Sequence, residues 1–274
     1  MNLDKNFLKE NIKTIIYALL IAIFIRSIFF QPFYIPSSSM EPNLLVGDRL
    51  FVSKYTYGYS KHSFPFSPNI FNGRIMFKKP ERGDVIVFKT SYHGDDFRII
   101  KLLCKILTTC KTDYIKRLIG LPGDEIKFIN GNLFINSEQV FRTKIHHDSS
   151  EKINCGDKEC INFNEKLPNG ITYKTSYINY ENIILNEPWA INGVGEETYN
   201  IPKDHYFFLG DNRDNSSDSR FVFKGKGPGY VHKDNLVGKA RILFFSSDSR
   251  IGSIFKFWKW KSIMRFNRFF KIIK

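Results

Sequence analysis

An apolar segment close to the N-terminus limits what this chain of 274 residues can fold into. Residues 14–30 (TIIYALLIAIFIRSIFF) are apolar apart from Thr14, Arg26 and Ser27. A helix of about 20 such residues crosses a bilayer. The long side chain of Arg26, near the end of the segment, can carry its charge to the interface. The segment therefore predicts a transmembrane helix.

The residues around this segment predict its orientation in the membrane and indicate that it is not cleaved off as a signal peptide. Three lysines lie among residues 1–13, and few cations directly follow the apolar segment, which places the N-terminus in the cytoplasm. A cleaved signal peptide would need small residues after the segment, but residues 27–34 (SIFFQPFY) are mostly bulky. We expect residues 1–13 in the cytoplasm, an uncleaved single-pass anchor at 14–30, and the rest of the chain outside the cytoplasm.

The formal net charge is +14, with 42% hydrophobic and 25% charged residues. This composition argues against a disordered chain. The positive charge favours contact with an anionic surface such as a lipid bilayer. Codon bias toward A and T explains the excess charge at least as well, because Lys, Ile, Asn, Phe and Tyr are all abundant. No signature of a nucleic-acid-binding module occurs, so we expect no nucleic acid partner.

The four cysteines form two close pairs, Cys104 with Cys110 and Cys155 with Cys160. An exported domain meets an oxidising compartment, where such pairs form disulfides. Free thiols are the alternative. Two histidines near Cys155 also suggest zinc, but the spacing of the first pair is wider than in the usual zinc motifs. Disulfides and free thiols stay open, and we expect no metal.

Beyond residue 30 the sequence predicts a mainly β domain. Val, Ile and Phe gather in short runs bounded by Gly-Asp turns. Asn130-Gly131 joins two such runs in a tight hairpin, because this dipeptide accepts positive φ angles. No stretch after the anchor has sustained helical periodicity. The expected strands lie within 44–55, 84–89, 125–140, 206–209 and 239–245.

The final segment, residues 251–274, carries seven cations, seven aromatic residues and no acid. Its cations do not fall on one helical face, so we expect a cationic aromatic tail instead of an amphipathic helix. Trp258 and Trp260 favour a position at a membrane interface. Packing of the tail against the core is the alternative.

Four polar motifs interrupt this β-rich sequence. In residues 35–44 (IPSSSMEPNL) two prolines flank a serine cluster, and they stiffen the backbone that carries it. Residues 82–88 (RGDVIVF) and 113–124 (DYIKRLIGLPGD) follow. Residues 210–220 (GDNRDNSSDSR) are dense in short polar side chains. Taken singly, each motif is more typical of a turn than of a site.

Lys116, in the third motif, lies among Tyr114, Ile115, Leu118 and Ile119. An ammonium group among apolar side chains loses hydration, and its pKa falls toward neutrality. Only the neutral amine can take a proton from a serine as general base. Most lysines are solvated, so composition alone does not assign this role.

Together, and in this order after an anchor, the four motifs resemble the bacterial signal peptidase I (leader peptidase) family. The matching pattern is P-S-x-S-M-x-P, then R-G-D, then Y-I-K-R with G-x-P-G-D, then G-D-N-R with S-x-D-S-R. It covers about 31–130 and 200–246. The resemblance implies an antiparallel β catalytic domain at 31–130 and 200–250, an inserted β-rich lobe at 131–199, and the tail at 251–274.

The resemblance also implies roles for single residues. Ser39 is then the nucleophile and Lys116 the general base. Ser37 joins the backbone N–H of Ser39 in the oxyanion hole, which stabilises the charge on the scissile carbonyl. Ser216 orients the lysine. The expected supporting ion-pair network consists of Arg117, Asp211, Asp218 and Arg220.

The implied function is that of a serine endopeptidase in the bacterial inner membrane. It removes N-terminal signal peptides from exported preproteins, cuts after small residues at −1 and −3, and needs no cofactor. Its partners are preproteins and the lipid bilayer. The substrate would bind as an added strand. The expected pocket residues are Phe33, Ile35, Met40, Leu44, Leu50, Val87, Asp113, Tyr114 and Ile115. This chain differs from some relatives in its single anchor and in Ser38, where Gly is frequent.

Two other function classes fit less well. A Ser-His-Asp hydrolase would carry a G-x-S-x-G turn, which is absent, although His205 lies near Asp211. Short Ser-x-x-Lys matches at 149–152 and 253–256 are of a kind that arises by chance. A membrane-tethered basic binding module would not need a paired serine and lysine.

The topology is testable in cells. Protease added to spheroplasts should digest the domain beyond residue 30, because the lysine bias leaves this domain outside the cytoplasm. Immunoblotting and N-terminal sequencing measure the outcome. Protection of the domain, or a mature N-terminus near residue 30, would contradict the predicted anchor.

Overall fold

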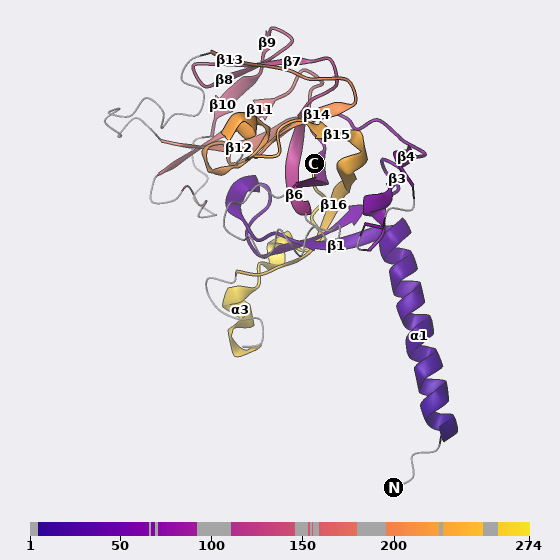
Figure 1. Cartoon of the computed structure of the whole chain (residues 1–274). Coiled ribbons are helices and arrows are strands. Elements are labelled where there is room, and N and C mark those ends of the chain that lie inside the picture. The colour runs from indigo at the N-terminus through magenta and orange to yellow at the C-terminus, as the bar shows by residue number, and fades with distance from the viewer. Residues whose placement is uncertain are drawn as a thin grey trace.

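The chain folds into one long N-terminal helix and a β domain (Figure 1). This computed structural model describes residues 5–65, 67–68, 71–91, 111–145, 153, 155, 159–179, 196–224, 227–248 and 257–274. Every pair of strands among them is antiparallel, so the predicted fold class is confirmed. The first cysteine pair and both short Ser-x-x-Lys matches lie outside the described residues.

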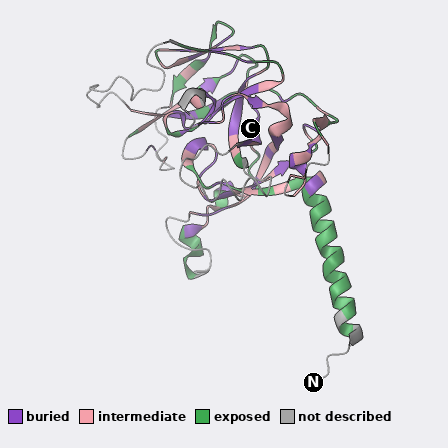
Figure 2. Cartoon of the chain, in the orientation of Figure 1, coloured by how far each residue is buried: buried purple, intermediate pink, exposed green. Residues whose placement is uncertain are grey.

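Helix α1 spans Lys5–Ile28 and projects away from the β domain. Its stretch Lys9–Ile28 is long and apolar enough to cross a membrane, with a mean hydropathy of 1.7. Residues 9–26 are exposed, and Ser27, where the helix meets the β domain, is buried (Figure 2). The helix begins before the predicted residue 14. It also ends earlier than predicted, because Phe30 already pairs with Ser53 in the sheet.

A single residue, Phe29, separates α1 from strand β1 (Phe30–Tyr34). Its N–H donates to Ile25 O at 2.9 Å, and its carbonyl accepts from Lys54 N at 3.0 Å. The hydroxyl of Tyr59 donates to Ile28 O at 3.1 Å. These bonds connect the end of the helix directly to the β domain, without a flexible linker.

A seven-stranded sheet combines strands from residues 30–120 with strands from residues 205–246. Its order is β1-β2-β16-β5-β6-β14-β15. The strands other than β1 are β2 (Asp48–Ser53), β16 (Leu236–Ser246), β5 (Val85–Ser91), β6 (Lys111–Gly120), β14 (His205–Leu209) and β15 (Val231–His232). Side chains alternate between the two faces of a strand, so β6 directs Lys116 and Arg117 to opposite sides.

Three smaller sheets complete the β domain. They are β13-β7-β8-β9, β10-β11-β12 and β3-β4. Their strands are β3 (Tyr59–Ser60), β4 (Arg74–Ile75), β7 (Glu125–Ile129), β8 (Asn132–Ile135), β9 (Glu138–Gln139), β10 (Phe141–Lys144), β11 (Cys160–Lys166), β12 (Thr172–Ile178) and β13 (Glu196–Asn200). The predicted hairpin joins β7 and β8, and Asn130 and Gly131 have φ angles of 48° and 75°.

The inserted lobe (residues 131–199) shares its core with the seven-stranded sheet. Leu133, Leu167 and Tyr173 of the lobe pack in one hydrophobic cluster with Ile119 and Phe207. The lobe therefore adds to the main core and has no separate core of its own among the described residues. Burial of the cluster fixes the lobe against β6 and β14.

Cys155 and Cys160 form a disulfide. Of the two interpretations that the sequence left open for this pair, the structure thus supports the disulfide. It joins the segment before β11 to the first residue of that strand.

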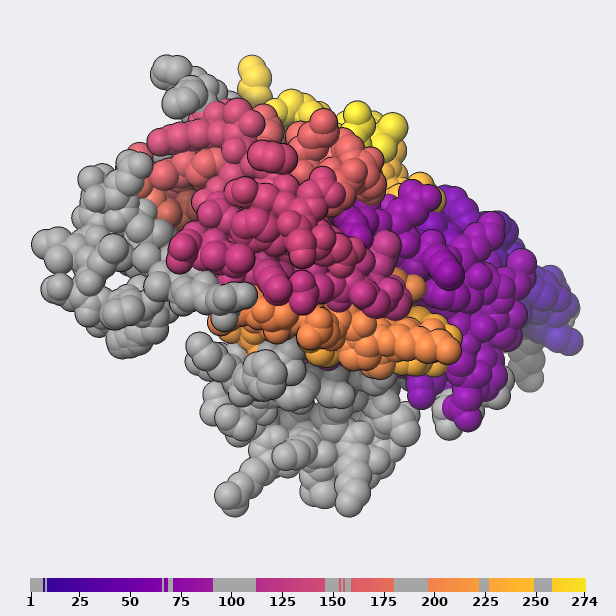
Figure 3. All heavy atoms as spheres, turned by 90° about the horizontal axis from the view of Figure 1, so that it is seen from above, coloured from indigo at the N-terminus to yellow at the C-terminus, as the bar shows by residue number. Residues whose placement is uncertain are grey.

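The C-terminal segment (residues 257–274) packs on the sheet. It contains the short helix α3 (Trp260–Ile263), and Ile263 is fully buried. Ile272 forms a bridge with Ile242 of β16, and the end of the segment lies beside the lobe (Figure 3). Trp258 is 66% exposed. The segment thus packs against the core, the alternative in the sequence analysis, while its tryptophans stay at the surface.

A buried ion pair holds this segment. The guanidinium of Arg268 donates to Asp48 at 2.7 Å, and the side chains are 2% and 0% exposed. Asp48 also accepts from Leu45 N at 2.8 Å and from Ser246 Oγ at 2.6 Å. The C-terminal segment is therefore joined to the first residue of β2.

Replacing Arg268 should destabilise the domain. In Arg268→Ala the carboxylate of Asp48 loses its nearest cationic partner and keeps the longer contact of 3.8 Å with Arg265. Removing one partner of a buried ion pair typically costs about 3–5 kcal/mol. Chemical unfolding of the full chain in detergent measures this loss. Lys261→Ala, which removes an exposed cation of the same segment, should leave the unfolding midpoint unchanged. Equal midpoints for the two variants would contradict the role of the buried pair.

Candidate active site

The serine cluster lies in a short turn that follows β1. Ile35 still pairs with the sheet, since its N–H donates to Asp48 O and its carbonyl accepts from Gly47 N, both at 2.9 Å. Residues Ser38–Met40 then form one turn of 3₁₀ helix, in which Met40 is fully buried. Burial of Met40 holds the turn against the core and leaves Ser39 at the edge of a cavity.

The structure brings the predicted nucleophile and base together. Lys116 Nζ lies 2.5 Å from Ser39 Oγ, and the two residues are 4% and 7% exposed. Ser37 Oγ lies 3.3 Å from Ser39 Oγ. All three polar groups therefore meet at one point, although 77 positions separate Lys116 from Ser39.

Burial lowers the pKa of Lys116 from 10.5 to about 8. The carboxylates of Asp218 and Asp211 oppose this shift, and the positive charge of Arg220 adds to it. The ring of Tyr114 lies 5.8 Å from Nζ. A lysine with this pKa is partly neutral near physiological pH, as a general base must be.

Two buried ion pairs surround the lysine. Arg117 forms two hydrogen bonds of 2.8 Å with Asp211, and Arg220 binds Asp218 at 2.8 Å. Burial alone would raise the pKa of Asp218, but Arg220 and the N–H of Gly210 keep that pKa below its usual range. The four residues of the predicted network therefore do form ion pairs beside the site.

Gly210 permits the close approach of two chain segments at the site. A Cβ at this position would lie 2.5 Å from Ser39 O and 2.1 Å from Ser216 Oγ. Real Cβ atoms do not approach other atoms so closely, so any larger residue would displace Ser39, Ser216 or both. Ser216 is 6% exposed, and among the described residues its hydroxyl has no hydrogen-bond partner. The predicted hydrogen bond from Ser216 to the lysine is thus not made in this structure.

A cavity of about 870 Å³ opens beside Ser39 and Lys116. Six of the nine predicted pocket residues line it: Phe33, Ile35, Val87, Asp113, Tyr114 and Ile115. The other three, Met40, Leu44 and Leu50, instead pack in the hydrophobic cluster with Ile35 and Val87. Lining residues that the sequence analysis did not name include Thr112, Asp214, Asn215, Ser217 and Phe221.

Asn212 is a further residue that the sequence analysis missed. Its N–H donates to Ser39 O at 3.1 Å, and its side chain donates to Ser38 O at 3.2 Å. No local signal marks it, because any asparagine in a polar loop looks alike in sequence. The histidine that a Ser-His-Asp site would use lies elsewhere: His205 Nδ1 is 2.9 Å from Lys203 O, and its ring packs on that of His232.

Comparison with known proteins identifies the family of this chain. The family model described as "Signal peptidase, peptidase S26" matches residues 8–245. This chain belongs to that family. The signal peptidase I of Rickettsia bellii strain OSU 85-389 is 35% identical over 94% of this chain and 83% of its own length. The signal peptidase I of Rickettsia typhi is 36% identical over 96% of this chain and 93% of its own length.

A crystal structure of a signal peptidase I from Enterococcus faecalis is 26% identical and covers 59% of this chain and 97% of its own, with a TM-score of 0.28. As a member of the signal peptidase family, the chain is a peptidase. The cavity beside Ser39 and Lys116 is its candidate active site.

Burial of Lys116 should lower the free energy of unfolding at pH values below the pKa of this lysine. Its folded pKa of about 8 lies below the unfolded value, so the unfolded chain binds more protons between about pH 8 and 10.5, and stability rises with pH across that window. Below pH 8 the cost is about 3 kcal/mol. Lys116→Met should therefore be more stable than wild type at pH 7.

Unfolding of both proteins in detergent from pH 6 to 11 measures this effect. The advantage of Lys116→Met should shrink above pH 8 and vanish near pH 10.5. Lys166→Met, at an exposed position, serves as control and should show no such dependence. A constant difference across the whole range would contradict a depressed lysine pKa.

Proposed function

We propose that this chain is a membrane-bound serine endopeptidase that removes N-terminal signal peptides from exported preproteins. The observation that carries the proposal is the contact of 2.5 Å between Lys116 Nζ and Ser39 Oγ in a buried corner of the cavity. Family membership supports the same activity.

The proposed reaction uses Ser39 as nucleophile and Lys116 as general base. Neutral Nζ accepts the proton of Ser39 Oγ as that oxygen attacks the scissile carbonyl. The backbone N–H of Ser39 and the hydroxyl of Ser37 donate to the resulting oxyanion, a term commonly worth several kcal/mol. The ammonium then gives its proton to the leaving amine. An ester to Ser39 remains.

Water completes the cycle. Lys116, neutral again, takes a proton from a water molecule that attacks the ester carbonyl, and the same oxyanion donors act a second time. Collapse of this intermediate returns the proton from Lys116 to Ser39 Oγ and releases the new carboxylic acid, which loses its remaining proton to solvent. Lys116 thus serves in both halves of the reaction, so its pKa governs the whole cycle.

The cavity supports a preference for small residues at −1 and −3. Phe33 and Ile35 line it from one side, and Val87, Tyr114 and Ile115 line it from β5 and β6. These apolar side chains leave too little room for large substrate side chains. Residues 112–116 and 33–39 all border the cavity, so an extended substrate lying between them can add as a strand.

The surface near the anchor supports contact with lipid. Phe29, Phe30, Tyr34 and Tyr55 are 38–47% exposed close to the end of α1. Aromatic rings at such positions settle among lipid head groups. We therefore place α1 across the inner membrane, with its N-terminus in the cytoplasm and the cavity near the outer surface.

Preprotein cleavage tests the catalytic assignment. Ser39→Ala and Lys116→Met should each lower kcat by about 10³-fold or more, because either change removes a reacting group. In wild type, kcat/KM should fall tenfold per pH unit below about 8, because the ammonium form of Lys116 cannot accept a proton. The cleavage rate is followed by gel assay at each pH.

His205→Ala and His232→Ala serve as controls and should keep full activity. An active Lys116→Met protein together with an inactive histidine variant would move the assignment to a histidine mechanism. A rate that stays level well into acid would also count against the lysine as base.

A further inference from the structure

The position of Ser39 depends on the loop at residues 210–216. Asn212 holds the carbonyl groups of both Ser38 and Ser39, and the side chain of Asn215 donates to Ser38 Oγ at 2.8 Å. The serine turn therefore lies where this loop holds it. What fixes the loop also fixes the nucleophile.

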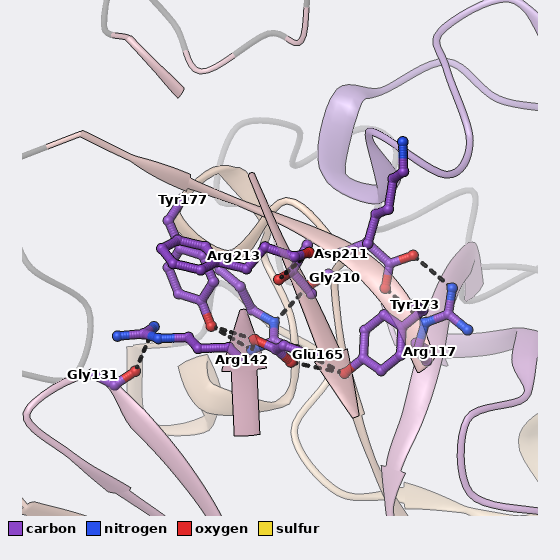
Figure 4. Close-up of polar contacts among 12 residues, drawn as sticks. Arg117, Gly131, Arg142, Glu165, Tyr173, Tyr177, Gly210, Asp211 and Arg213 are labelled. Atoms are coloured by element: carbon purple, nitrogen blue, oxygen red, sulfur yellow. Dashed lines mark hydrogen bonds and ion pairs between the residues drawn. The ribbon is translucent and has the colours of Figure 1, made fainter. Parts of the chain in front are cut away.

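Arg213, next to Asn212, is the buried centre of this loop. Its side chain is 1% exposed, yet all five of its N–H groups have acceptors. Nε donates to Gly210 O at 3.3 Å. Nη1 donates to Glu165 at 2.8 Å and to Tyr177 at 2.6 Å. Nη2 donates to Glu165 and, at 2.9 Å, to Tyr173 (Figure 4).

The carboxylate of Glu165 neutralises the positive charge of Arg213. It is 1% exposed, and each of its carboxylate oxygens accepts one hydrogen bond from Arg213. It also accepts from Tyr177 at 2.7 Å and from Tyr173 at 3.0 Å. Because a buried ion pair is favourable only when its remaining hydrogen bonds are satisfied, this closed network holds Arg213 in one orientation. A lysine at position 213 could not make the same hydrogen bonds, because it lacks the planar set of N–H donors of a guanidinium group.

The acidic partner comes from the inserted lobe and not from the catalytic motifs. Glu165 lies on β11, and its neighbour strand β12 binds the loop on both sides of Arg213. Ser176 N donates to Asp211 O, and Ile178 N donates to Asp214 Oδ2, both at 2.9 Å. The lobe thus contacts the loop through one buried charge, two tyrosine hydroxyls and two backbone groups.

We propose that Glu165 is a positioning residue for Ser39. Its carboxylate fixes Arg213, Arg213 fixes the turn that begins at Asn212, and Asn212 fixes the carbonyl of Ser39. This inference rests on the proposed role of Ser39 as nucleophile. It gives the inserted lobe a part in catalysis, although none of the lobe residues that the structure describes lines the cavity beside Ser39.

The kinetic signature follows from where the substrate binds. Apolar residues that line the cavity, such as Phe33, Val87 and Ile115, belong to strands of the seven-stranded sheet. Loss of the Glu165 carboxylate should therefore move Ser39 more than it moves the pocket. Misplacement of a reacting group by about 1 Å can cost about 100-fold in rate. A fall in kcat with little change in KM is expected.

The first test uses the full chain in detergent with a preprotein substrate. Glu165→Gln should lower kcat about 10- to 100-fold and leave KM within about twofold. The midpoint of the pH profile should stay where it is, because neither Glu165 nor Arg213 is among the charges that shift Lys116. Glu159→Gln, the same change at an exposed position of the lobe, should behave as wild type.

A second variant separates positioning from stability. Glu165→Leu combined with Arg213→Met replaces the ion pair by apolar side chains of similar size, which often restores stability. The thermal midpoint should return to the wild-type range while kcat stays low. Tyr173→Phe, which removes one hydroxyl of the network, should lower kcat more mildly without unfolding the protein.

The outcomes distinguish the two proposals. If kcat recovers together with the thermal midpoint in the double variant, or if Glu165→Gln turns over like wild type, Glu165 has only a structural role. A shifted pH midpoint would show that it acts through charge on Lys116 and not through position. An active Ser39→Ala protein would instead overturn the proposed nucleophile, whatever the Glu165 variants do.

Discussion

A lysine can accept a proton from serine only if it is held without its own proton, and the surroundings of Lys116 serve this requirement. Burial lowers its pKa, but a single unpaired carboxylate nearby would restore the ammonium form. In this structure three buried acids near the site each have an arginine partner. The pairs are Arg117–Asp211, Arg220–Asp218 and Arg213–Glu165. The carboxylates of Asp211 and Asp218 raise the pKa of Lys116 and the guanidinium of Arg220 lowers it, so the arginine partners limit how far these acids favour the ammonium form.

Local chemistry in the sequence was enough to predict much of the fold. The Asn130-Gly131 turn specifies its hairpin because few dipeptides accept two successive positive φ angles. The apolar segment specifies α1 by length and hydropathy. The contact between Ser39 and Lys116 is different in kind. It joins a turn to a strand far along the chain, and no periodicity encodes such a contact, so it was predicted only through the resemblance of the four motifs to a family.

Other parts of the site carry no readable signal. Glu165 is one acid among several in a polar lobe, and its burial depends on where β11 packs against Arg213. Arg268 looks like any other cation of a basic tail until Asp48 is seen beside it. For the same reason, pocket residues taken over from the resemblance were only partly matched. Met40 and Leu44 pack in the core, because the turn after Ser39 directs them inward.

The direct passage from α1 into β1 has a mechanical consequence. Only Phe29 lies between helix and strand, and Lys54 and Tyr59 form hydrogen bonds to this junction. The helix and the strand that follows it are therefore expected to move together as a rigid unit. A helix embedded in a bilayer changes its tilt when the thickness of the hydrocarbon layer changes. For α1 placed in the membrane as proposed, such a tilt would be transmitted to the mouth of the cavity, and lipid composition would then affect the angle at which Ser39 meets a peptide.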